Sequence, residues 1–200
     1  MRQRRKKIVN NDSLATMVTA DKDDLFVLRK CAGYLKSYLQ AKKDISRDAL
    51  DVILYILGDA IDLFAIYVGS MMTSDERSQF LNSLTLSRLD TEDQIKIFHD
   101  ALIQFDSNAQ REIISHVQQV LDARMDQCKY RGMSGLEKKV FLLKRLFALS
   151  DAEVELCVFT AIITFWEKME HFFIYHVDCN RFSNRNILAQ ILGMDRHKLN

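Results

Sequence analysis

The sequence predicts an all-α fold, a multi-helix bundle with two long buried helices and a helix-turn-helix-like element at its C-terminal end. Proline is absent and glycine occurs only 6 times in 200 residues, whereas β-rich folds use both residue types in their many turns. Hydrophobic residues make up 48% of the chain and charged residues 28%, a globular balance that argues against bulk disorder. Apolar residues also recur at helical spacing along most of the chain.

The sequence of residues 1–128 predicts a flexible arm followed by five helices. Residues 1–12 are basic and then rich in Asn and Asp, so we expect a mobile arm there. In the first helix Asp23 and Asp24 lie at the N-terminal end and Lys42 at the C-terminal end, as the helix dipole favours. The second expected helix is apolar almost all round and is the first of the two long buried ones. The five expected helices span residues 22–42, 46–70, 74–86, 91–105 and 108–128.

The clearest interruption of the helical pattern is residues 129–135, which contain two of the six glycines. We take it as the boundary between an N-terminal helical subdomain, residues 13–131, and a C-terminal one, residues 136–200. The C-terminal subdomain begins with a helix over residues 136–147 that carries a basic cluster.

A second long helix follows. Ser150 and Glu153 have the spacing of a capping box, which predicts that a helix begins there. The helix is apolar nearly all round and is expected to run to about Val177 as the second long buried helix.

Five polar residues interrupt the apolar surface of the 46–70 helix. If this segment is one continuous helix, they fall within about 80° of each other. They are Asp48, Asp51, Tyr55, Asp59 and Asp62. We favour a solvated edge of the bundle, and the alternative is a stripe that binds a basic partner.

The sequence contains no recognisable catalytic or cofactor motif. No glycine is followed by lysine, so a phosphate-binding P-loop is excluded, and G-x-S-x-G and G-x-G-x-x-G are also missing. The densest group of potential metal ligands includes His171 and His176, which would point about 140° apart on a helix, whereas metal-binding pairs lie three or four residues apart. We therefore predict no enzyme activity, no cofactor and no metal for this chain.

Charge and cysteine content indicate a cytoplasmic protein. The net charge of +1 creates no global attraction to nucleic acid or to an acidic membrane. The 4 cysteines contain no C-x-x-C pair, which favours a reducing compartment, and Cys157 is expected to be buried in its apolar run. Residues 52–72 are apolar, but Asp59 and Asp62 fall among them, so a buried helix is a better interpretation than a membrane span.

Residues 184–200 have the pattern of a helix-turn-helix. Ala189 is the small residue where two helices would touch, Gly193 takes the turn, and Asp195 would cap a second helix. The expected interior positions are apolar: Leu188, Leu192, Met194 and Leu199. Side chains suited to phosphate or base contacts are Arg185, Arg196, His197 and Lys198. Three interpretations stay open: a structural winged-helix-like element, a DNA contact, or a chance pattern at a helix end. The second helix would be very short, so we expect either that the natural chain continues or that the motif is vestigial.

Two runs resemble a region of certain bacterial AAA+ ATPases that precedes the ATPase core. They are LKRLFALSDAEVELCVFTAI at residues 143–162 and FSNRNILAQILGMD at residues 182–195, and the resemblance covers roughly the last third of the chain. It implies a helical, helix-turn-helix or winged-helix-like domain that recruits substrates or partners or supports assembly. No catalytic residue of that family can be transferred, because its ATPase motifs are absent here.

From these observations we expect a non-catalytic helical interaction module. A protein partner or self-association is the expected mode of action, with no membrane partner. The alternative is a helix-turn-helix DNA-binding regulator, so DNA stays a possible partner.

Overall fold

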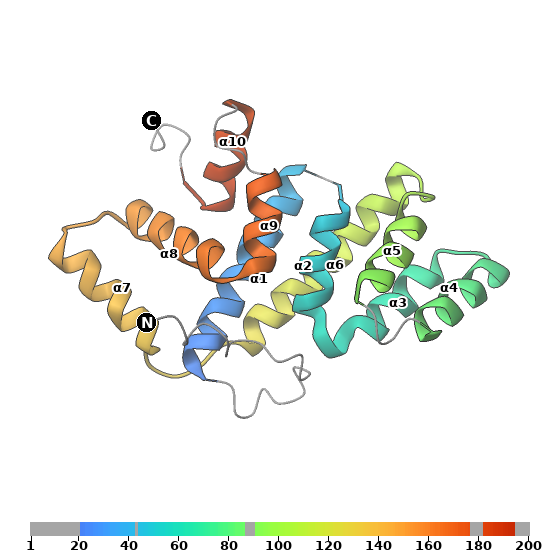
Figure 1. Ribbon diagram of the computed structural model, residues 1–200, viewed down its shortest axis with the longest axis horizontal. Coiled ribbons are helices and arrows are strands. Elements are labelled where there is room, and N and C mark those ends of the chain that lie inside the picture. Colours follow the sequence, from blue (N-terminus) through green and yellow to red (C-terminus); the bar gives the residue numbers. More distant parts are fainter. Residues whose placement is uncertain (1–20, 43, 87–90, 177–181, 195–200) are drawn as a thin grey trace, which may run out of the picture.

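The computed structural model describes residues 21–42, 44–86, 91–176 and 182–194, and within these ranges it contains ten α-helices and no strand (Figure 1). The all-α prediction is therefore confirmed. The helices are α1 (Lys22–Lys42), α2 (Arg47–Leu57), α3 (Ile61–Ser70), α4 (Ser74–Leu86), α5 (Thr91–Leu102), α6 (Ser107–Gln127), α7 (Gly135–Leu146), α8 (Asp151–Phe165), α9 (Glu167–His176) and α10 (Phe182–Ile191). A short 3-10 turn, Gly58–Ala60, joins α2 to α3.

The core is organised around α1 and α2. Helix α1 packs against α6, α10 and α7, and α2 packs against α5, α6 and α9. Leu35 and Leu39 of α1 and Leu50 of α2 are 0% exposed. Buried residues from both sides of the glycine-containing interruption belong to one apolar cluster. The division into subdomains at residues 13–131 and 136–200 stays a prediction.

The helix over residues 46–70 is not continuous, so the prediction of one long buried helix there is wrong. Ser46 begins α2 as expected, because its hydroxyl accepts a hydrogen bond from the Ala49 amide at 3.2 Å. The helix ends at Gly58, which has φ 53° and ψ −115°. Residues with a Cβ rarely adopt a positive φ, whereas glycine adopts it at little cost. The chain therefore changes direction at Gly58 before α3 begins.

The second expected long helix, residues 152–177, is also divided. Trp166 has extended backbone angles, φ −117° and ψ 99°, and its amide donates to the Ile162 carbonyl at 2.9 Å. Its carbonyl accepts from the amides of Met169 and Glu170, both at 2.9 Å, so Trp166 ends α8 and begins α9. No glycine or proline causes this break. The break accompanies a contact with another helix, because the centroids of the Trp166 and Tyr55 rings lie 4.8 Å apart.

Local capping follows the sequence pattern. The Ser150–Glu153 capping box at the start of α8 is present as predicted. At the end of α10, Gly193 has φ 63°, and the Met194 amide donates to the Ala189 carbonyl at 2.8 Å, the long hydrogen bond of a Schellman motif. The turn expected at Gly193 is thus present. The second helix of the expected helix-turn-helix lies outside the described residues.

Candidate interaction surface

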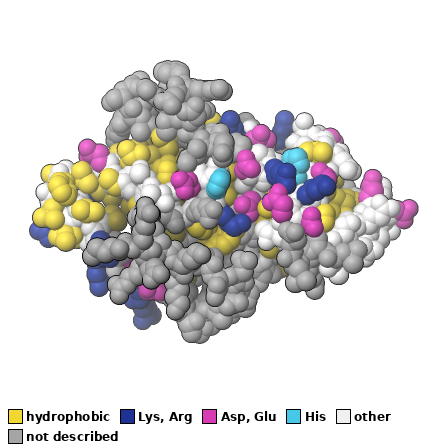
Figure 2. All heavy atoms as spheres, viewed as in Figure 1, with side chains coloured by type: hydrophobic (Ala, Val, Ile, Leu, Met, Phe, Trp, Pro, Cys, Tyr) yellow, Lys and Arg dark blue, Asp and Glu magenta, His cyan; other side chains and the backbone are white. Residues whose placement is uncertain are grey.

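Helix α7 carries a large group of apolar side chains that the other described residues leave uncovered. None of its twelve residues, all of which the structure describes, is buried. We define the α7 apolar surface as Phe141 (51% exposed), Leu142 (56%), Leu143 (46%), Leu146 (67%) and the C-cap residue Phe147 (68%). Figure 2 shows hydrophobic side chains gathered at the end of the molecule where Figure 1 places α7 and α8. Large exposed apolar patches on soluble proteins mark interaction sites.

Part of the apolar surface, Leu143 and Phe147, is the outer continuation of a face that packs at its inner end. Leu136, Val140, Leu143 and Phe147 follow one another at helical spacing along a single face of α7. Leu136 and Val140 pack against the core cluster. The helix then runs past the core, so Leu143 and Phe147 on the same face stay exposed.

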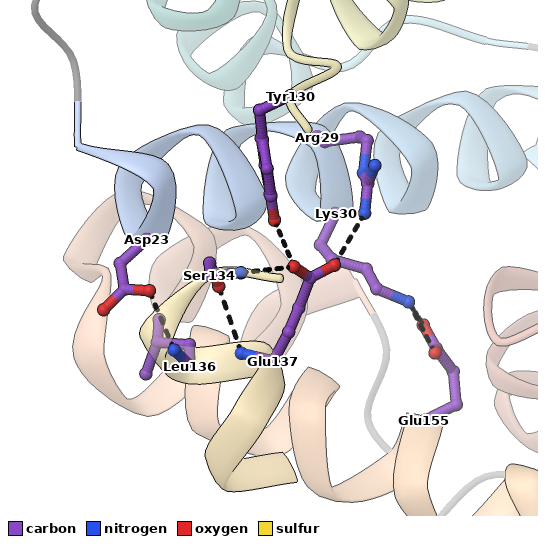
Figure 3. Close-up of polar contacts among 8 residues, drawn as sticks. All are labelled: Asp23, Arg29, Lys30, Tyr130, Ser134, Leu136, Glu137 and Glu155. Atoms are coloured by element: carbon purple, nitrogen blue, oxygen red, sulfur yellow. Dashed lines mark hydrogen bonds and ion pairs between the residues drawn. The ribbon is translucent and has the colours of Figure 1, made fainter. Parts of the chain in front are cut away.

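The inner end of α7 is anchored to α1 by a polar contact (Figure 3). Asp23 accepts a hydrogen bond from the Leu136 amide at 2.8 Å and so caps α7 from another helix. This hydrogen bond lowers the pKa of Asp23, because it favours the charged carboxylate. A Cβ at Gly135 would lie 3.0 Å from an Asp23 carboxylate oxygen, so glycine permits this close approach.

Glu137 strengthens the same anchor. Its carboxylate accepts from the Tyr130 hydroxyl at 2.6 Å and from the Ser134 amide at 2.8 Å, and Arg29 of α1 approaches to 3.2 Å. Burial raises the pKa of Glu137, but the hydrogen bonds from Tyr130 and Ser134 and the charge of Arg29 outweigh it, so the net shift is downward. Figure 3 shows these donors converging on one carboxylate.

Helix α8 is held to α1 in a similar way. Glu155 accepts from the Lys30 ammonium at 2.6 Å and 2.8 Å and from the Tyr34 hydroxyl at 2.7 Å. Burial and the neighbouring Glu155 charge raise the pKa of Tyr34, so it remains a neutral hydroxyl donor. Both helices of the α7–α8 hairpin are therefore attached at defined points of α1.

The turn between the two helices is tight. Ala148 has φ 51°, which is uncommon for a residue with a Cβ, and the Leu149 amide donates to the Lys144 carbonyl at 3.0 Å. This closes a Schellman-type turn directly after Phe147. The apolar end of α7 is thus held between an anchored base and a closed turn.

Basic side chains surround the apolar surface. Four of them belong to α7: Lys138, Lys139, Lys144 and Arg145. The Arg145 guanidinium lies 5.9 Å from the centroid of the Phe141 ring, and Lys144 pairs with Asp151 at the start of α8. The arrangement can bind an apolar surface with an acidic edge.

Comparison with known proteins supplies no family for this chain. No protein-family model, no curated protein and no solved structure matches it. The resemblance to the helical region of AAA+ ATPases therefore stays a prediction, and the role of the α7 apolar surface has to be inferred from its chemistry.

The polar stripe predicted on the 46–70 helix is divided between α2 and α3, so its expected geometry is wrong. Within α2, Asp51 accepts from the Lys168 ammonium of α9, and the same ammonium lies 5.7 Å from the centroid of the Tyr55 ring. Asp48 and Asp62 are exposed on α2 and α3 respectively. The side chain of Asp59 lies outside the described residues. Asp51 and Tyr55 therefore join two helices of this chain, whereas partner binding by the stripe stays a prediction.

The side chains predicted to contact DNA lie outside the described part of the chain. Arg196, His197 and Lys198 lie outside the described residues, as does the side chain of Arg185. Leu188 and Ala189 of α10 and Leu192, the residue after it, are buried, as expected for the first helix of the motif.

The structure corrects one further sequence expectation. Cys157 is exposed, so the expectation of a buried thiol is wrong, because α8 packs only its Val158, Phe159 and Ile162 side into the core. Among the described residues, no three His, Cys, Asp or Glu side chains are grouped as a metal site requires. Among the described helices, none combines the length and apolarity needed to cross a membrane.

The sequence analysis missed the α7 apolar surface although a signal was present. The run Phe141–Phe147 contains five large apolar residues in seven, distributed around more of the helix than one buried face can cover. Such a distribution predicts either burial on several sides or an uncovered surface, and only the neighbouring helices decide between them.

Proposed function

We propose that this chain is a non-catalytic helical interaction module that docks a protein partner through the α7 apolar surface. The observation that carries the proposal is the exposure of Phe141, Leu142, Leu143, Leu146 and Phe147 on a helix that is anchored to α1. Fully burying one Leu or Phe side chain is worth about 1.5–3 kcal/mol, so covering this surface is strongly favourable. The anchored base supports the proposal, because a pre-organised surface loses little conformational freedom on binding.

The charge of the hairpin favours a protein over an anionic membrane or DNA. Residues 135–153 carry four basic side chains and three acidic ones, namely Glu137, Asp151 and Glu153. Binding to phosphates depends on a large net positive charge, and here the three acidic side chains offset most of the four basic ones. A protein surface with apolar residues and an acidic edge fits this mixture better.

Photo-crosslinking tests the proposal directly. A benzophenone amino acid is placed at Leu146, and at Ile103 as a matched control, since Ile103 is also an exposed apolar residue (62%) but lies after α5. In cells of the native host we expect a discrete protein adduct from position 146 and none from position 103. No protein adduct at 146, or the same adducts at both positions, would contradict the proposal.

The wider context that the resemblance implies is a larger AAA+ ATPase in which this module recruits partners or supports assembly. A downstream G-x-x-x-x-G-K-[ST] motif in the same reading frame is the expected finding. A stop codon directly after Asn200 would contradict this context, but it would leave the docking proposal intact.

The second candidate function is a helix-turn-helix DNA-binding regulator. The left-handed turn at Gly193, with φ 63°, supports it because such a turn follows the first helix of the motif. DNA binding that weakens steeply as salt rises would support this function. The docking proposal instead requires no DNA affinity at physiological salt.

A further inference from the structure

No further inference is drawn: the strongest candidate, the hollow of about 230 Å³ between α3 and α6 that Leu63, Val120 and the buried Arg124 help to line, carries none because nothing in the structure shows what covers it.

Discussion

Helices α2 and α7 are both rich in large apolar residues, yet they have opposite environments. In α2, seven of eleven residues are buried. In α7, whose residues are all described, none of twelve is buried. The difference comes from their neighbours, because α1, α5, α6 and α9 surround α2, whereas α7 packs mainly against α1, at its inner end, and against α8, which follows its outer end. The comparison teaches that apolar content alone does not determine burial, and that an uncovered apolar helix is the place to look for function.

The largest expected effect comes from the same substitution in the two helices. Leu50→Ala in α2 removes a side chain that is 0% exposed and should lower the free energy of unfolding by about 2–5 kcal/mol. Leu146→Ala removes a side chain that is 67% exposed, and it should change the free energy of unfolding by at most about 0.5 kcal/mol. Urea denaturation of the two variants measures both values. If both variants lost the same free energy of unfolding, Leu146 would have to be packed in the free protein, and α2 and α7 would not differ in burial.

A smaller effect is expected where α7 is anchored. Asp23→Ala removes the acceptor for the Leu136 amide and should cost about 1 kcal/mol, as loss of a helix cap does. The matched control is Asp24→Ala. Asp24 also lies in the first turn of α1, so its charge interacts with the α1 helix dipole as that of Asp23 does. Hydrogen exchange of the α7 amides should accelerate in the Asp23 variant and not in the control. Equal acceleration in both would mean that the α1 dipole, rather than the cap, supports α7.

The smallest effect is a pH dependence of the same anchor. The folded-state pKa values of Asp23 and Glu137 are both lowered from ordinary values of 3.8 and 4.5. A lowered carboxyl pKa contributes stability that is present above the ordinary value and is lost as pH falls through the folded-state value. Protection factors of the α7 amides, corrected for the intrinsic exchange rate, should therefore fall in acid, below about pH 4, before those of α2.

Glu137→Gln is the control for this pH effect. It keeps the size of the side chain and removes the titrating carboxyl, so part of the acid dependence in α7 should disappear. Protection of α7 that is unchanged down to pH 3 in the wild type would show that the two carboxylates do not hold the helix.

Features that depend on a few neighbouring residues could be predicted from the sequence. The bounds of α1 and α4 are those expected, and the Ser150–Glu153 capping box is present. The turn at Gly193 was also expected, because the conformation there suits a residue without a Cβ. The break at Gly58 had a visible signal as well, since a glycine inside a helix costs about 1 kcal/mol relative to alanine.

Features that depend on distant contacts could not be predicted. The break at Trp166 has no local cause, and it accompanies packing against Tyr55 on another helix. The exposure of Cys157 and of the α7 apolar surface was missed because an apolar run shows what can be buried and not which neighbours are present to bury it. The apolar run at residues 141–147 marked α7 as unusual, but only the tertiary arrangement showed that its surface is uncovered.

The sequence by itself determined the all-α fold and most helix ends, because hydrogen bonds within a helix and its caps join residues only a few positions apart. Only the tertiary structure decided which apolar faces are covered. The contacts that orient α7 and α8 join residues far apart in the chain, Asp23 to Leu136 and Lys30 to Glu155, at separations of 113 and 125 residues. No local pattern specifies such pairs, since they form only when the whole bundle brings α1 beside the hairpin. That geometry leaves the outer end of α7 uncovered.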